Sequence, residues 1–206
     1  AAILTYFYKV PYYTALAAGT LAAALAAAVV GYPTLRTKLR GDYFAIATLG
    51  FGEATRVLLE NLKITQGARG LPGRTQYTTL PVAAVLAAVV SFVARNFVVS
   101  VYGRNAVAVR EDPVAAELIG VRLLRTKMIS LVFSAACAGL AGGLYAHYIS
   151  FIQPVMFTMV QSTQLTAAVV CGGTGSLTGP ALAAFLFVSL PELLRAAQMW
   201  RLVLYG

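Results

Sequence analysis

The chain has 206 residues, of which 59% are hydrophobic and 11% are charged, and its formal net charge is +9. Soluble domains carry about 25% charged residues, so this composition excludes disorder, collagen and a disulfide-rich secreted scaffold, and it argues against a soluble globule. An integral membrane protein is predicted. The basic residues lie in short clusters between apolar runs, as membrane proteins place them at the cytoplasmic face, so nucleic-acid binding is not expected.

Charge-free stretches predict the membrane segments, because about 20 helical residues cross the hydrocarbon core. Pro33 is expected to close the first segment. Gly50 and Gly52 interrupt the second, which is therefore predicted to be either buried in the bundle or broken. Six segments are expected, with a seventh just starting at the end of the chain, and they cover 12–32, 43–59, 80–101, 128–149, 156–171 and 180–194.

Two basic loops predict the orientation. Arg36, Lys38 and Arg40 flank the first loop, and the polar stretch 102–127 forms the second. Two spans separate these loops, so both can lie in the cytoplasm. The Gly- and Pro-rich residues 67–73 predict another loop on the opposite side.

Residues 112–120 predict a short helix capped at both ends. Asp112 can accept hydrogen bonds from the free N–H groups of a first turn, and Pro113 suits the first helical position. Gly120 suits the left-handed residue that ends a helix. Such a rigid helix in a cytoplasmic loop could dock into another protein, or it could be an ordinary loop helix.

Several polar or small residues within the apolar segments are candidates for a translocation path. Glu53 and Arg56 lie on one helix face and either line the path or neutralise each other near a helix end. Small residues repeat every four positions around Gly139, which favours close helix packing, either sliding or static. The candidate path residues are Glu53, Arg56, Gly139, Gly143, Thr174 and Ser176.

Other reactive side chains are expected to be structural. Cys137 and Cys171 fall in apolar runs and predict neither a disulfide nor a metal site. His147, near a membrane edge, is expected to pack rather than to bind a ligand. The string around Ser176 predicts a non-helical break and lacks the lysine of a phosphate-binding loop.

Four sequence strings, named at the end of this paragraph in chain order, together resemble the permease subunits of branched-chain (hydrophobic) amino acid ABC importers, the LivM type. Val114–Gly120 is similar to the Glu-Ala-Ala-x3-Gly motif of importer permeases, with Val114 at the usual glutamate. Members of that family are longer at both ends, and the segment after Gly73 looks short. The strings are LRGDYFAIATLGFGE (39–53), VAAELIG (114–120), AGLAGGLYAHY (138–148), and GGTGSLTGP (172–180) followed by LPELLR (190–195).

The resemblance implies an all-α, polytopic transmembrane bundle with broken or short helices. Residues 1–206 would form a single permease domain, incomplete at both ends, with a cytoplasmic coupling loop at 102–127. The coupling helix would be received by a cytoplasmic ATPase subunit, whose ATP hydrolysis would tilt the spans to alternate access. The coupling residues would be Asp112, Pro113, Val114, Ala115, Ala116, Glu117, Leu118, Ile119 and Gly120.

The same resemblance implies the partners and the location. A periplasmic binding protein would deliver the amino acid, and a second permease chain, in a heterodimer, would complete the pore in a bacterial inner membrane. The chain itself would be no enzyme and hold no cofactor, since ATP binds the partner subunits; the sequence contains no Gly-Lys pair and so no Walker A loop.

Three alternatives stay open at the level of the sequence. Close relatives of the family serve urea and short amides, and the binding protein usually sets specificity. An intramembrane serine hydrolase would use Ser176 and His147, although no second acid or base lies nearby in the sequence. An ungated channel would need a polar face along several spans, which the sequence does not display.

Overall fold

The computed structural model describes residues 2–8, 10–37, 42–62, 71–72, 78–149, 151–173, 175–176 and 178–190. Helices dominate these residues, which confirms the all-α class. The elements in chain order are α1 (Ala2–Tyr8), α2 (Tyr12–Arg36), α3 (Asp42–Asn61), β1 (Leu71–Pro72), α4 (Leu80–Val99), α5 (Val101–Glu111), α6 (Pro113–Leu118), α7 (Leu123–Tyr148), β2 (Phe151–Ile152), the 3-10 turn η3 (Pro154–Met156) and α8 (Met159–Gly172), followed by an apolar helix at Thr178–Leu190.

The chain divides into two compact units, Ala1–Met156 (unit 1) and Phe157–Gly206 (unit 2). Within unit 1, β1 and β2 pair antiparallel, with Leu71 opposite Ile152. Of the predicted loop 67–73, only this strand falls among the described residues. The single-domain expectation for 1–206 stays a prediction.

Four stretches of the described chain are long and apolar enough to cross a membrane: α2, α4, α7 and Pro154–Gly172, which contains α8. The Thr178–Leu190 helix is apolar but shorter, and the end of the predicted sixth segment lies outside the described residues. The helix α3 does not qualify, because four of its residues are charged (Asp42, Glu53, Arg56 and Glu60).

The prediction that Pro33 closes the first span is wrong, because α2 continues through it to Arg36. A proline this close to a helix end removes one backbone hydrogen bond, and little helix follows it. Two threonine hydroxyls support the last turns. Thr34 Oγ1 donates to the carbonyl of Val30 at 2.9 Å, and Thr37 Oγ1 donates to the carbonyl of Pro33 at 3.0 Å.

The second segment is predicted to be either buried in the bundle or broken, and the broken alternative is wrong, whereas burial in a complete bundle stays a prediction. The helix α3 runs unbroken through Gly50 and Gly52, and both glycines are exposed. A glycine in a helix costs about 1 kcal/mol relative to alanine, which two full flanking turns on each side can offset.

The closest helix pair in unit 1 is α2 with α7, which run antiparallel. Gly139 of α7 lies so near α2 that a Cβ there would come within 2.5 Å of the Ala23 Cβ and 3.2 Å of the Gly19 carbonyl oxygen. Toward the other end of the pair, Gly31 of α2 packs against Leu131. Lipid provides no hydrophobic force between helices, so this close approach of small residues supplies the packing attraction.

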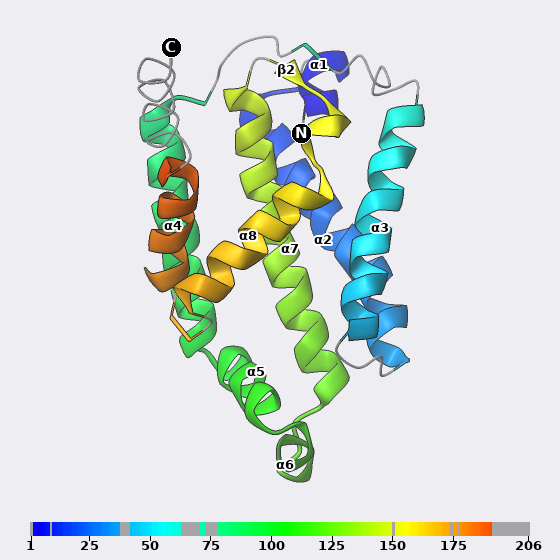
Figure 1. The fold of residues 1–206 in the computed structure, drawn as a ribbon, viewed down its shortest axis with the longest axis vertical. Helices are drawn as coiled ribbons and strands as arrows, with labels where there is room; N and C mark the ends of the chain where they lie inside the picture. Colours follow the sequence, from blue (N-terminus) through cyan, green and yellow to red (C-terminus); the bar gives the residue numbers. More distant parts are fainter. Residues whose placement is uncertain are drawn as a thin grey trace, which may run out of the picture. The chain divides into compact units, whose positions relative to one another are not determined.

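This antiparallel pairing places the end of α2, with Arg36, beside the start of α7. Figure 1 shows α2, α3, α4 and α7 of unit 1 running lengthwise, with α5 and α6 at one end. The C-terminal end of α2 and the 102–127 loop therefore lie at the same end of the unit, as the charge pattern predicts.

The sequence analysis missed α5, which fills the first half of the 102–127 loop. Ser100 ends α4 and also caps α5, accepting a hydrogen bond from the Gly103 N–H at 3.4 Å. The turn is tight: a Cβ on Gly103 would lie 2.4 Å or less from the carbonyl oxygens of Phe97 and Val98, so only glycine fits. In the sequence, Ser100 followed three residues later by Gly103 is the pattern that could have indicated the start of this helix.

Replacing Gly139 by leucine is expected to force α2 and α7 apart. Overpacking of this kind costs about 1–3 kcal/mol, and the melting temperature of the purified protein should fall by roughly 5 °C or more. Gly142→Leu is the matched control, because a Cβ at Gly142 meets nothing within 4 Å. Equal melting temperatures for the two variants would show that the glycine contact does not hold the pair.

Candidate functional site

The predicted loop helix is present as α6, and a side chain closes its first turn. Asp112 Oδ1 accepts hydrogen bonds from the backbone N–H groups of Val114 at 2.8 Å and Ala115 at 3.2 Å. Pro113 occupies the first helical position, where no N–H is needed. A cap of this kind contributes about 1 kcal/mol.

The other end of α6 closes in a Schellman motif. The Gly120 N–H donates to the carbonyl of Glu117, and the Val121 N–H donates to the carbonyl of Ala116, both at 3.0 Å. Gly120 has a φ of 88°, a left-handed conformation that costs other residues about 1–2 kcal/mol. Local bonds at both ends therefore fix a helix of only six residues.

The exposed surface of α6 carries three large apolar side chains beside Glu117. Val114, Leu118 and Ile119 are 68%, 84% and 76% exposed, whereas Ala116 on the inward side is 2% exposed. Val114 and Leu118 lie one turn apart and share a face. Large apolar side chains gathered in the open mark a surface that a partner covers.

Neighbouring helices hold α6 in place. It contacts both α5, which ends at the capping Asp112, and α7, which begins just after Val121. Val109 of α5 and Thr126 of α7 are buried in this junction. The small helix is thus mounted on the end of a membrane span rather than hanging from a loose loop.

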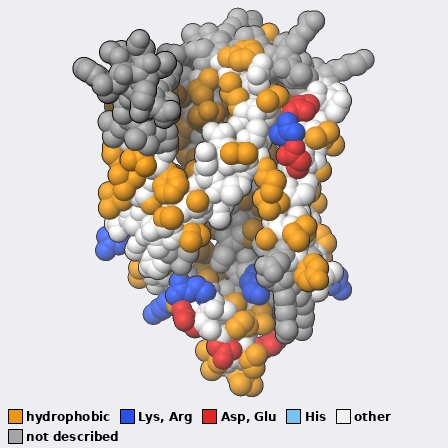
Figure 2. All heavy atoms as spheres, viewed as in Figure 1, with side chains coloured by type: hydrophobic (Ala, Val, Ile, Leu, Met, Phe, Trp, Pro, Cys, Tyr) orange, Lys and Arg blue, Asp and Glu red, His pale blue; other side chains and the backbone are white. Residues whose placement is uncertain are grey.

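Glu53 and Arg56 are in contact in α3, as their spacing predicts. Arg56 Nε donates to Glu53 Oε1 at 2.9 Å, and Arg56 Nη1 donates to Glu60 Oε1 at 2.6 Å. The sequence analysis missed Glu60, although it lies four residues after Arg56. Figure 2 shows acidic and basic side chains together interrupting the surface over α3. The mutual pairing supports the self-neutralising interpretation, and a role in a path stays a prediction.

Gly143, another predicted path residue, is buried in α7 and anchors His147. The His147 Nδ1 donates to the Gly143 carbonyl at 2.7 Å, and its Nε2 lies 3.2 Å from Thr5 Oγ1. The imidazole ring also packs edge-on against Tyr12, with 5.1 Å between ring centroids. This histidine therefore ties α1, α2 and α7 together, and both of its ring nitrogens are engaged. Gly139 faces α2, as described above, and the path role of both glycines remains a prediction.

In unit 2, the glycine-rich string makes the predicted non-helical break. Gly173 has a φ of 87°, and a Cβ on Gly172 would lie 2.5 Å from the Gly179 carbonyl group, so the two backbones touch. Ser176 is exposed, and its Oγ accepts a hydrogen bond from the Gly179 N–H at 3.2 Å. Thr174 lies outside the described residues. Substrate contact by either side chain stays a prediction.

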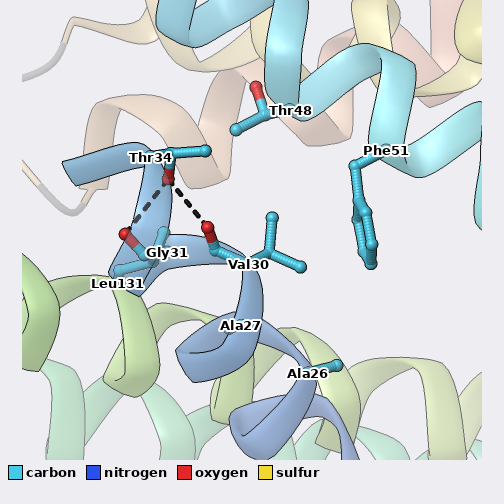
Figure 3. A pocket seen from close by; sticks show the side chains of 8 residues that line it. All are labelled: Ala26, Ala27, Val30, Gly31, Thr34, Thr48, Phe51 and Leu131. Atoms are coloured by element: carbon cyan, nitrogen blue, oxygen red, sulfur yellow. Dashed lines mark hydrogen bonds between the residues drawn. The ribbon is translucent and has the colours of Figure 1, made fainter. Parts of the chain in front are cut away.

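A cavity of about 170 Å³ lies between α2, α3 and α7 (Figure 3). The Thr34 hydroxyl donates to backbone carbonyls of its own helix, so the wall offers mainly hydrocarbon. No sequence pattern predicts this cavity, because three separate helices form it, and none of the predicted path residues lines it. The lining residues are Ala26, Ala27, Val30, Gly31, Thr34, Thr48, Phe51 and Leu131.

The described part of the chain brings together no three His, Cys, Asp or Glu side chains that could hold a metal ion. Cys137 and Cys171 are both free thiols. The features that stand out are therefore a mounted apolar helix and an apolar cavity between helices.

Replacing Gly120 by alanine is expected to loosen α6, because the left-handed ending becomes strained. A cost of about 1.4 kcal/mol corresponds to tenfold, so amide hydrogen exchange across residues 114–121 should accelerate roughly tenfold. Gly142→Ala, at an open position in α7 with ordinary helical backbone, is the control. Unchanged exchange in Gly120→Ala would mean that the Schellman ending does not stabilise the helix.

Comparisons with known proteins agree with the helical, membrane-spanning structure. The family model described as the branched-chain amino acid transport system permease component matches residues 1–206. The high-affinity branched-chain amino acid transport system permease protein LivM of Escherichia coli (strain K12) is 35% identical over 240 residues, covering 100% of this chain and 56% of that protein. LivM of Salmonella typhimurium is 34% identical over the same span.

A more distant relative is the autoinducer 2 import system permease protein LsrC of Enterobacter sp. (strain 638), which is 30% identical over 46% of this chain and 29% of its own length. No solved structure matches. The chain spans about half the length of the LivM proteins it matches. The whole-chain match to the family model, together with the identity to two LivM proteins, shows that this multi-pass membrane chain belongs to the family of branched-chain amino acid transport permease components.

Proposed function

We propose that this chain is the membrane-spanning part of a permease subunit in an ATP-driven ABC importer of branched-chain amino acids. The importer works by alternating access in a bacterial inner membrane. Its partners are cytoplasmic ATP-binding subunits, a second permease chain in a heterodimer and a periplasmic substrate-binding protein. The chain carries no cofactor, and ATP binds the ATPase subunits.

The observation that carries this proposal is the exposed apolar face of α6. A free helix end with leucine 84% and isoleucine 76% exposed to water is unfavourable unless another protein covers it. The caps at Asp112 and Gly120 keep the six-residue helix rigid, so a partner that grips it can push it without unwinding it. A groove in the ATPase subunit is the proposed receptor.

The movement of α6 must then be transmitted to the membrane spans. Because α6 contacts the start of α7 directly, a displacement of α6 shifts α7. The span α7 is in turn locked to α2 through Gly139 and Gly31, and to α1 through His147. These three helices move as one body, which is what alternation between two accessible states requires.

The cavity between α2, α3 and α7 supports an aliphatic substrate. Its wall of alanine, valine, phenylalanine and leucine favours burial of a branched hydrocarbon side chain over a small polar molecule such as urea or an amide. We propose it as a stopping point for the amino acid side chain. A serine hydrolase is disfavoured, because both nitrogens of His147 are already engaged by Gly143 and Thr5.

Leu118→Asp is expected to abolish coupling. Placing a charge in the centre of an apolar contact should cost about 2 kcal/mol or more, or roughly a thirtyfold loss of affinity for the ATPase subunits. Co-purification of the ATPase and ATP-dependent leucine uptake into proteoliposomes should both be lost. The control is Val107→Asp, which adds the same charge at a 42% exposed position on α5 of the same loop.

Retained co-purification and uptake in Leu118→Asp would refute the assignment of α6 as the coupling helix. Competition experiments on the wild-type transporter address the substrate separately. Excess isoleucine or valine should suppress leucine uptake, and excess urea or acetamide should not. Suppression by urea or acetamide instead would move the substrate class while leaving the coupling helix intact.

A further inference from the structure

A second cavity, of about 420 Å³, lies beside α6, between α5 and the start of α7. Tyr102 and Asn105 line it from α5, and Arg122, Arg125 and Ile129 line it from the start of α7 and the residue before it. Ile119, Gly120 and Val121, at the ending of α6, and Thr126 of α7 complete its wall. The cavity thus adjoins the coupling helix and meets its exposed face at Ile119, whereas Val114 and Leu118 do not line it.

The charge in this cavity is unbalanced. The side chains of Arg122 and Arg125 make no ion pair or hydrogen bond with any residue that the structure describes, whereas Arg56 and Arg110 each contact a glutamate. Figure 2 shows most of the basic side chains on the drawn face toward the end that carries α5 and α6. Two arginines that line one cavity, with no Asp or Glu among its lining residues, form a candidate site for an anion.

The depth of the cavity relative to the bilayer can be estimated by counting back along α7 from Tyr148, taken as one edge of the hydrocarbon core. At 1.5 Å per residue, the helical stretch Ile129–Tyr148 spans about 29 Å, close to the roughly 30 Å of a hydrocarbon core. Ile129 therefore lies at the edge of the hydrocarbon, and Arg125, one turn earlier, lies about 6 Å beyond it in the headgroup layer. Tyr102, just past the end of the span α4, has the interfacial position that tyrosine favours.

We propose that this cavity binds the headgroup of an anionic phospholipid, with the phosphate held between Arg122 and Arg125. The Asn105 amide can donate to the headgroup, and the acyl chains can run past Ile129 into the bilayer. The position of Ile129 at the edge of the hydrocarbon, beside the two arginines, favours a lipid over a free phosphate or a partner's carboxylate. Because the end of α6 forms one wall, the bound lipid fixes where the coupling helix sits. The site depends on the span α7 and not on which substrate is transported.

The test is a titration of the purified transporter with dioleoylphosphatidylglycerol, followed by native mass spectrometry of the complex. The double variant Arg122→Gln/Arg125→Gln should bind the lipid about 25-fold more weakly, at about fivefold for each basic residue. The matched control is Arg104→Gln/Arg110→Gln, which removes two charges from the same loop outside the cavity. It should change binding by less than about twofold, and dioleoylphosphatidylcholine should not compete.

Three results would overturn the proposal. Equal weakening in both double variants would mean diffuse attraction between the loop and anionic lipid. Displacement of the phosphatidylglycerol by inorganic phosphate would assign the cavity to a free anion. Loss of the ATPase subunits from Arg122→Gln/Arg125→Gln with lipid binding unchanged would assign the arginines to a carboxylate of that partner.

Discussion

The close contact between α2 and α7 is the interaction on which the rest of unit 1 depends. Lipid cannot drive two helices together by the hydrophobic effect, so their attraction comes from packing at short range, and small residues permit it. Gly139 against Gly19 and Ala23 sets that distance at one level, and Gly31 against Leu131 sets it at another. The same contact supplies two walls of the apolar cavity and brings His147 to the start of α2.

A second feature is the contrast between α6, which is short, capped at both ends and exposed, and the long apolar spans. The four spans bury little of their surface within the described part of the chain, as expected for helices that face lipid. The helix α6 exposes apolar residues outside the four apolar stretches, and the proposed coupling role has a partner protein cover them. The Asp112 side chain at one end and backbone hydrogen bonds at the other hold α6 rigid, and its contact with α7 joins the exposed face to the packed pair.

Sequence patterns specified the local features well and the tertiary ones poorly. Asp112, Pro113 and Gly120 each act through bonds within a few residues, so the caps of α6 could be predicted. Pro33 and Gly50 led to wrong predictions of a helix end and a helix break. A helix tolerates a proline near its end, and it tolerates a glycine that has two turns of helix on each side. The apolar cavity, the tie of His147 to Thr5 and the direction that Gly139 faces depend on residues more than 80 positions apart, which no local pattern records.

The central claim is that α6 lies outside the bilayer and under an ATPase subunit. It is tested most directly by labelling Leu118→Cys with a membrane-impermeant maleimide, after Cys137 and Cys171 are replaced by alanine. The account predicts rapid labelling in inside-out vesicles that lack the ATPase, protection when the ATPase is present, and no labelling in right-side-out vesicles. Labelling from the outside, no labelling from either side, or labelling that the ATPase leaves unchanged would contradict it.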